Sequence, residues 1–262
     1  MTKYKNCVAV VGNFKYLIKY FPRFYNEITT KGKYKDDIII ITTYLSPTFL
    51  IPEVIRNKNI KVLRFKKIRF KKKVRNSYLK LNTGDHPNRF KTKNFQWFKL
   101  NLFNKKLKIW KKILYLDINM TIHFDINPIL NLKVDNIFLA KADGYPDYKR
   151  KLRNQFDTSH NYFNLLEKSF NLNDNKYFQT GLMLFDTNII KHNTFKNILM
   201  YANKYPLSIT NEQGILNLFF QKNDDYVYEE LPEKIDNKYI YYYWKNLENN
   251  IIITKQLTTK NK

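Results

Sequence analysis

Asp117 and Asn119 stand two positions apart where an apolar run ends, in the stretch YLDINMTI (115–122). The segment KILYLDI (112–118) has the length and composition of a buried strand. Oxygen-bearing side chains at a strand end can form a tight turn. Alternatively, two oxygens at i and i+2 around a bend can converge on one hard cation, which then holds a diphosphate. Ligands of open α/β sheets bind outside the carboxyl ends of the strands, which is where this aspartate would stand. Strand-end Asp followed by Asn is also common in turns, so both interpretations stay open at this point.

Buried strands and amphipathic helices alternate around this point. Strands are predicted at 7–12, 36–43, 59–65, 112–118, 136–143 and 177–186. Helices are predicted at 16–29, 46–58, 94–110, 193–205 and 211–222, with Pro22 at a start or a break of the first. This alternation predicts an α/β fold with a mostly parallel central sheet and helices on both faces. We see no internal repeat and no linker rich in Pro, Gly or Ser, so we expect one domain over residues 1–262.

The composition indicates a globular and strongly basic protein. Apolar residues make up 44% of the chain, which is enough for a sizeable core. The chain has 47 basic and 22 acidic residues and a formal net charge of +25, which attracts polyanions of any kind: nucleic acid, an anionic membrane or a nucleotide diphosphate. The stretch RFKKIRFKKKVR (64–75) has eight basic side chains with two phenylalanines interleaved among them, a pattern that could lie along a nucleic-acid backbone. A solvated loop in a lysine-rich protein is the alternative.

The N-terminal sequence and the single cysteine indicate in which cellular compartment the protein is expected. Cys7 is the only cysteine, so a disulfide framework or a zinc cluster is excluded and a reducing environment is expected. The start MTKYKNCVAVVGNF has no cleavage pattern, and no run of 18 apolar residues predicts a membrane span. We expect a cytoplasmic protein.

Five blocks of sequence together resemble the glycogenin and galactinol synthase group, family 8 of the glycosyltransferases. The first is VVGNFKY (10–16), similar to the segment that holds the uracil base. The run at 99–130 resembles the family's helix, strand and Asp-x-Asp motif, and LAKADGYPDY (139–148) its alanine–aspartate–glycine stretch. YFQTGLMLFD (177–186) looks like its Phe-Asn-Ser-Gly strand, and NEQGILNLFF (211–220) like the helix that begins Asp-Gln-Gly. The blocks occur in the family's order over most of the chain.

The resemblance implies a GT-A fold and transfer of a hexose from a nucleotide sugar, commonly a UDP-sugar, with retention of configuration. It further implies Mn²⁺ or Mg²⁺ as cofactor and an unknown glycan or protein as acceptor, and a homodimer is compatible with it. Nucleic acid is then not the expected partner. A catalytically silent GT-A domain that binds a nucleotide sugar or a protein remains the alternative.

The resemblance also assigns roles to individual residues. Glu212, Gln213 and Asp143 would serve the reacting sugar. The donor would be bound by Val10, Gly12, Asn13, Tyr16, Lys99, Asp117, Asn119, Gln179, Thr180, Gly181 and Lys260. Tyr16 offers a flat face to a base and Asn13 an amide to read its edge. Lys93 is a second candidate for the role of Lys99.

Two positions depart from the family's metal site. Asn119 stands where the family has an aspartate, and Thr254 aligns with its C-terminal histidine. The resemblance thus leaves Asp117, Asn119 and Thr254 as the metal ligands. Because the affinity for a hard cation depends on the number and charge of its ligands, we expect weak metal binding.

Overall fold

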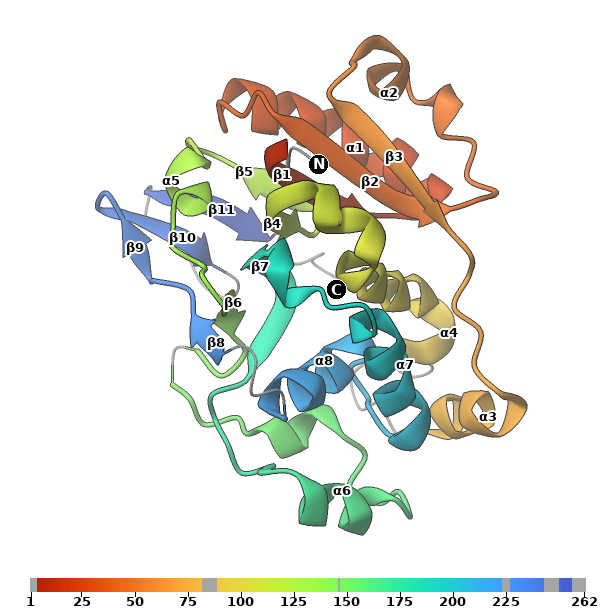
Figure 1. The fold of residues 1–262 in the computed structure, drawn as a ribbon. Helices are drawn as coiled ribbons and strands as arrows, with labels where there is room; N and C mark the ends of the chain where they lie inside the picture. Colours follow the sequence, from red (N-terminus) through yellow and green to blue (C-terminus); the bar gives the residue numbers. More distant parts are fainter. Residues whose placement is uncertain (1–3, 82–88, 146, 223–226, 243–249, 256–262) are drawn as a thin grey trace, which may run out of the picture.

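The computed structural model describes residues 4–81, 89–145, 147–222, 227–242 and 250–255. Its main feature is a seven-stranded sheet, viewed in Figure 1 with the helices around it. In order across the sheet its strands are β3 (Ile60–Phe65), β2 (Asp37–Thr43), β1 (Tyr4–Val11), β4 (Trp110–Leu116), β7 (Phe178–Asp186), β6 (Ile137–Ala142) and β8 (Val227–Glu230). Only the two pairings of β7 are antiparallel, so the sheet is mostly parallel, as predicted.

The central strands are buried on both faces, which explains their continuous apolar sequences. Alternate residues of β1 and β2 point to opposite faces. Val8 and Ile38 belong to one core cluster, and Ala9 and Ile39 belong to the other. The two clusters are therefore the two faces of one sheet, each covered by other elements.

Helix α1 (Phe14–Thr30) covers the first face. Leu17, Phe21 and Phe24 form part of its buried stripe. The helix runs through Pro22 without ending, so our prediction of a start or break at this residue is wrong. An interior proline costs roughly 3 kcal/mol, and burial of the large apolar side chains beside it offsets that cost.

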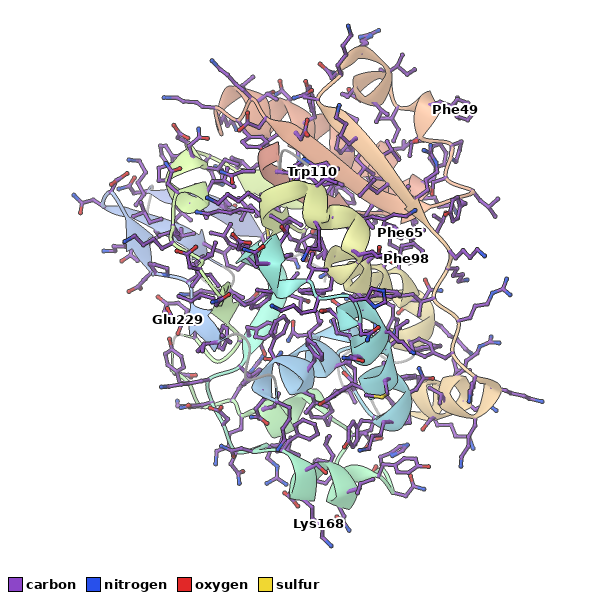
Figure 2. All side chains as sticks on the ribbon, viewed as in Figure 1. Phe49, Phe65, Phe98, Trp110, Lys168 and Glu229 are labelled. Carbon is purple, nitrogen blue, oxygen red and sulfur yellow. The ribbon has the colours of Figure 1, made fainter. Side chains whose placement is uncertain are left out.

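The second face is covered by an irregular segment and two helices. The predicted helix 94–110 is instead the 3₁₀-helix η2 (Asn94–Phe103), followed by η3 (Lys105–Ile109), and Trp110 already belongs to β4. The seven residues 97–103 are all buried, so the segment hides its whole circumference and not one helical stripe. Trp110 and Phe98 lie within the molecule in Figure 2. Helices α7 (Thr194–Lys204) and α8 (Glu212–Gln221) pack beside η2.

The remaining helices are short. They are η1 (Thr48–Leu50), α2 (Pro52–Arg56), α3 (Lys72–Lys80), α4 (Arg89–Thr92), α5 (Asn127–Leu130), η4 (Leu152–Gln155), α6 (Phe163–Ser169) and η5 (Thr187–Ile189). The helix predicted over 46–58 is thus divided into η1 and α2, with Pro52 in the first turn of α2. Among the described helices, none combines the length and hydropathy needed to cross a bilayer.

A second, four-stranded sheet stands beside the first (Figure 1). Its strands, in order, are β5 (Met120–Ile122), β11 (Ile251–Lys255), β10 (Lys238–Tyr242) and β9 (Lys234–Ile235). Only three residues separate β4 of the main sheet from β5 of the small one. Because β11 pairs with β5, the register places Thr254 opposite Thr121 and Lys255 opposite Met120, close to the end of β4.

Candidate functional site

The stretch that follows β4 is both a turn and the centre of a polar cluster. The amide of Met120 donates to the carbonyl of Asp117 over 2.9 Å, which closes the turn between β4 and β5. The amide of Asp117 donates to the carbonyl of Gly181 over 2.8 Å and so fixes the aspartate to the neighbouring strand β7. The turn expected at this strand end is therefore present, and the cation interpretation depends on what surrounds the Asp117 carboxylate.

The carboxylate of Asp117 is held by three donors. The ammonium of Lys99 lies 2.9 Å from Oδ1 and that of Lys255 lies 2.6 Å from Oδ2. The hydroxyl of Tyr115 donates to Oδ1 over 2.6 Å. Burial alone would raise the pKa of Asp117, but the charges of Lys255 and Lys99 hold it well below its usual range. Asp117 is therefore ionised at neutral pH, and each of its two oxygens holds an ammonium group.

Lys99 joins this carboxylate to a second one. It lies on η2, is only 5% exposed, and its ammonium lies 3.2 Å from Oε1 of Glu212 and 3.1 Å from the carbonyl of Thr180. Burial would lower the pKa of Lys99, but the carboxylates of Asp117 and Glu212 raise it above its ordinary value. The all-round burial of η2 explains this position, because the segment carries the lysine into the interior.

Glu212 and Gln213 begin helix α8 and are fixed to β7. The Thr180 hydroxyl donates to Oε1 of Glu212 over 2.9 Å, and the Thr180 amide donates to Oε1 of Gln213 over 3.1 Å. Glu212 is 1% exposed, and its Oε2 has no hydrogen-bond partner among the described residues. Asn211, just before the helix, has a φ of 57°, a conformation that costs an asparagine energy and is enriched at functional sites.

The cluster extends from Gln213 to Asp143. The Gln213 amide donates to Oε1 of Gln155 over 2.9 Å, and the Gln155 amide donates to Oδ2 of Asp143 over 3.1 Å. Burial raises the pKa of Asp143, although Tyr177 and Arg150 act in the opposite direction. The three residues expected to serve the reacting sugar are thus joined in one hydrogen-bonded series.

Gly181 and Gln179 lie on β7 beside Asp117. A Cβ atom at Gly181 would lie 3.1 Å from the Met120 methyl and 3.6 Å from Oδ2 of Asp117, so the glycine keeps this side of the carboxylate open. The hydroxyl of Tyr241, from β10 of the second sheet, donates to Oε1 of Gln179 over 3.3 Å.

The residues expected to hold the base come from the β1–α1 connection. The Asn13 side chain accepts from the Tyr16 amide over 2.9 Å and caps α1, so its carbonyl oxygen already has a donor. The Tyr16 ring is 42% exposed and packs against Tyr20 at 4.7 Å between centroids. Burial, followed by Tyr20 and Asp117, raises the pKa of Tyr16, while Lys99 lowers it, which places the phenol within the field of the cluster.

Val10 and Gly12 support this connection from behind. The Val10 side chain is completely buried in the core, so only its backbone could face a ligand. The Gly12 amide donates to Ile41 over 3.2 Å, and its carbonyl accepts from the Thr42 hydroxyl over 2.8 Å.

The metal ligands suggested by the sequence do not form a site that suits a divalent cation. Both Asp117 oxygens already hold an ammonium group. The Thr254 hydroxyl is bonded to the His123 ring over 2.8 Å, and the Asn119 amide would contribute no charge. No group of three His, Cys, Asp or Glu side chains suited to a metal occurs in the described part of the chain. A hard cation would have to enter beside two like charges, which its ligand requirements disfavour. Lys260 lies outside the described residues.

Four participants were missed in the sequence: Tyr115, Gln155, Tyr241 and Lys255. Tyr115 stands two positions before Asp117, at the end of β4, a spacing that puts both side chains on one side of the chain. No local sequence pattern identifies the other three residues, because the folding of distant chain segments brings each of them to the site. Lys93, the second candidate lysine, has its pKa lowered by burial and then by Arg89 and Lys255, while Asp117 raises it, so it lies near the same cluster.

The basic stretch 64–75 does not present aromatic rings for stacking on bases. Phe65 is buried in the core (Figure 2), and the Phe70 ring packs against Tyr78 and Trp97 at 5.3 and 5.0 Å between centroids. Lysine and arginine side chains of the stretch are mostly exposed. This arrangement agrees with the solvated interpretation, with its phenylalanines anchoring the segment.

A comparison with known protein families identifies the family of this protein. The model of glycosyl transferase family 8 matches residues 8–255. The chain belongs to this family. The resemblance stated from the sequence is confirmed, and family membership supports transfer of a hexosyl group from a nucleotide sugar. None of the curated proteins matches the chain.

Solved structures show the same fold. The galactosyltransferase LgtC, in complex with donor and acceptor sugar analogues, matches with a TM-score of 0.58 at 14% identity, over 85% of this chain and 72% of LgtC. An active-site mutant of LgtC matches with a TM-score of 0.60 at 12% identity, over 95% of this chain and 86% of that one. Mouse xyloside xylosyltransferase 1 matches with a TM-score of 0.54 at 10% identity, over 97% of both chains. The fold of this family 8 protein is therefore GT-A, as expected.

Proposed function

We propose that this family 8 protein transfers a hexose from a UDP-sugar to a glycan or protein acceptor with retention of configuration. The observation that carries the proposal is the single cluster formed by Asp117, Lys99, Glu212, Gln213 and Asp143 at the carboxyl end of β4. These residues come from segments that are far apart in sequence. A buried ion-pair network contributes little net stability, and buried charges with perturbed pKa values are concentrated at functional sites.

Each part of the cluster has a role in this reaction. Tyr16 supports the uracil base, and Lys99 with its neighbouring lysine charges faces the diphosphate. The unpartnered Oε2 of Glu212 and the carboxylate of Asp143 are acceptors for sugar hydroxyls. Gln213, held by hydrogen bonds at both amide atoms, keeps a fixed dipole beside the anomeric carbon.

The bond changes need no dedicated base among these residues. The bond from the anomeric carbon to the UDP oxygen breaks, and a bond to the acceptor oxygen forms on the same face. The leaving diphosphate takes the proton of the acceptor hydroxyl, so the products are UDP and a glycoside. Lysine ammonium groups stabilise the charge that develops on the diphosphate.

The two ammonium groups on Asp117 favour one competing function, a silent GT-A domain that binds a nucleotide sugar without turnover. A panel of nucleotide sugars distinguishes the two. We expect a rise in melting temperature with UDP-sugars and slow release of UDP from at least one of them. A variant with Gln213→Ala should retain the thermal shift and lose the release. A thermal shift without release in the native protein would support the silent domain, and no shift with any nucleotide would contradict both.

A further inference from the structure

We infer that the ammonium group of Lys255 takes the place of a divalent cation, so that the protein binds the donor diphosphate through lysines without a metal. This inference rests on the proposed function, since it concerns how the same site holds UDP. It starts from the mismatch between the Asp117 environment and the needs of a metal ion.

The position of the Lys255 ammonium is that of a bound cation. It lies 2.6 Å from Oδ2 of Asp117, the shorter of that residue's two ion pairs. Lys255 is the last described residue of β11, and β11 pairs antiparallel with β5, the strand that follows Asp117 and Asn119. The backbone register, and not a flexible surface chain alone, therefore delivers the ammonium to the carboxylate.

The charges around Asp117 suit an anionic ligand. Two carboxylates, Asp117 and Glu212, oppose two ammonium groups, Lys99 and Lys255. Lys93 adds a third ammonium group beside them, because the charges of Lys255 and Asp117 both act on it. Positive charge therefore gathers at this carboxylate without a metal ion.

The chemistry of an ammonium group suits this substitution. It carries three N–H donors, so it can hold Asp117 with one of them and exchange its remaining contacts for phosphate oxygens when the donor binds. Asp117 then acts as a positioning residue that holds Lys255 toward the diphosphate. The Asp117 carboxylate keeps Lys99 and Tyr115 as partners whether or not a diphosphate is bound, so its charge stays compensated.

The first experiment is a calorimetric titration of UDP into the native protein, in EDTA and in excess Mn²⁺. We expect the same Kd in both within about twofold. Lys255→Gln keeps a polar side chain, one atom shorter, and removes the charge. It should weaken UDP binding about tenfold or more, because a hydrogen bond from a charged group is stronger than one from a neutral amide. The Kd of Lys255→Arg for UDP should lie between those of the native protein and of Lys255→Gln.

Lys168→Gln is the matched control, because Lys168 is exposed on α6 at the outer edge of the molecule (Figure 2). It removes the same charge elsewhere and should leave the Kd unchanged. A second variant, Asn119→Asp with Lys255→Ala, removes the ammonium and adds a carboxylate. We expect its UDP binding to depend on Mn²⁺ and to be lost in EDTA.

The outcomes separate the inference from the proposed function. UDP binding that disappears in EDTA and returns with Mn²⁺ in the native protein would overturn the inference and leave the UDP site intact. An unchanged Kd in Lys255→Gln, with native melting behaviour, would overturn it as well. Absence of UDP binding under every condition would contradict the proposed function itself.

Discussion

Single side chains of the cluster carry charges that only their neighbours make tolerable in the interior. Lys99 is the clearest case, because it is buried and faces two carboxylates. Removing one member of such a group leaves the others uncompensated, which costs far more than the net value of the interaction.

We predict that Lys99→Met lowers the free energy of unfolding by about 3–5 kcal/mol, since Glu212 would remain buried without its cation. Urea denaturation followed by circular dichroism measures this. The double variant Lys99→Met with Glu212→Gln should recover part of the loss. A single variant as stable as the native protein would show that the charges are not energetically coupled.

A second prediction at this scale concerns Tyr16 and the base. Tyr16→Ala should weaken UDP binding about fivefold to a hundredfold, because stacking of a base on an aromatic ring contributes roughly 1–3 kcal/mol. Tyr16→Phe is the matched control, which keeps the ring and should bind nearly as well as the native protein. Equal affinities of all three proteins would remove Tyr16 from the site.

Secondary-structure elements were predicted correctly where the pattern of apolar residues fits only one type of element. The six strands expected from the sequence all occur. The central ones carry the continuous apolar run of a strand buried on both faces, whereas β3 lies at the sheet edge and is partly exposed, unlike the buried strand expected there. The helix expected over 94–110 failed because its residues are buried all round, and apolar residues on every side satisfy a helical period by default. The second sheet was missed because β9 and β5 have only two and three residues.

The residues of the site could likewise be predicted only where they belong to a continuous motif. Asp117 could be found from the strand end and Lys99 from a family resemblance, since both belong to continuous motifs. Lys255 could not, because its approach to Asp117 depends on the pairing of β11 with β5 over a separation of 138 positions. Residue spacing within a motif carries no information on such a contact.

A contact between elements predicts a pH effect on stability. Nε2 of His160 lies 2.6 Å from the hydroxyl of Ser77 on α3, and its Nδ1 accepts from the Tyr162 amide. Burial lowers the pKa of His160 below its ordinary 6.5, although Asp157 opposes this. The folded state thus binds the proton less readily than the unfolded state, so stability is lost as the pH falls through 6.5.

His160→Gln should accordingly reduce the loss of melting temperature between about pH 7.5 and about pH 5.5. Burial also lowers the pKa of His123, so part of the slope should persist in this variant. Melting curves of both proteins at the two pH values provide the test. An identical slope in native protein and variant would show that His160 titrates alike in the folded and unfolded states.

At the scale of the whole molecule, the net charge of +25 favours anionic ligands over a long range. If lysines and not a metal carry the diphosphate, UDP affinity should fall steadily as ionic strength rises, because salt screens charges at the partly open site. Titrations in rising concentrations of sodium chloride measure this dependence. Lys168→Gln should give the same slope as the native protein and Lys255→Gln a shallower one; a native affinity independent of salt would contradict the prediction.

The order of strands along the chain also sets an order of events during synthesis. All seven strands of the main sheet lie within residues 4–230, so a nascent chain of that length already holds the material for both faces of its core. β11, with Lys255, leaves the ribosome only later and must then insert between β5 and β10. Chains of this length commonly fold through populated intermediates. Asp117 and Lys99 are both synthesised before Lys255, so such an intermediate can pair them first, and the proposed nucleotide site is completed by a strand that emerges after the main sheet.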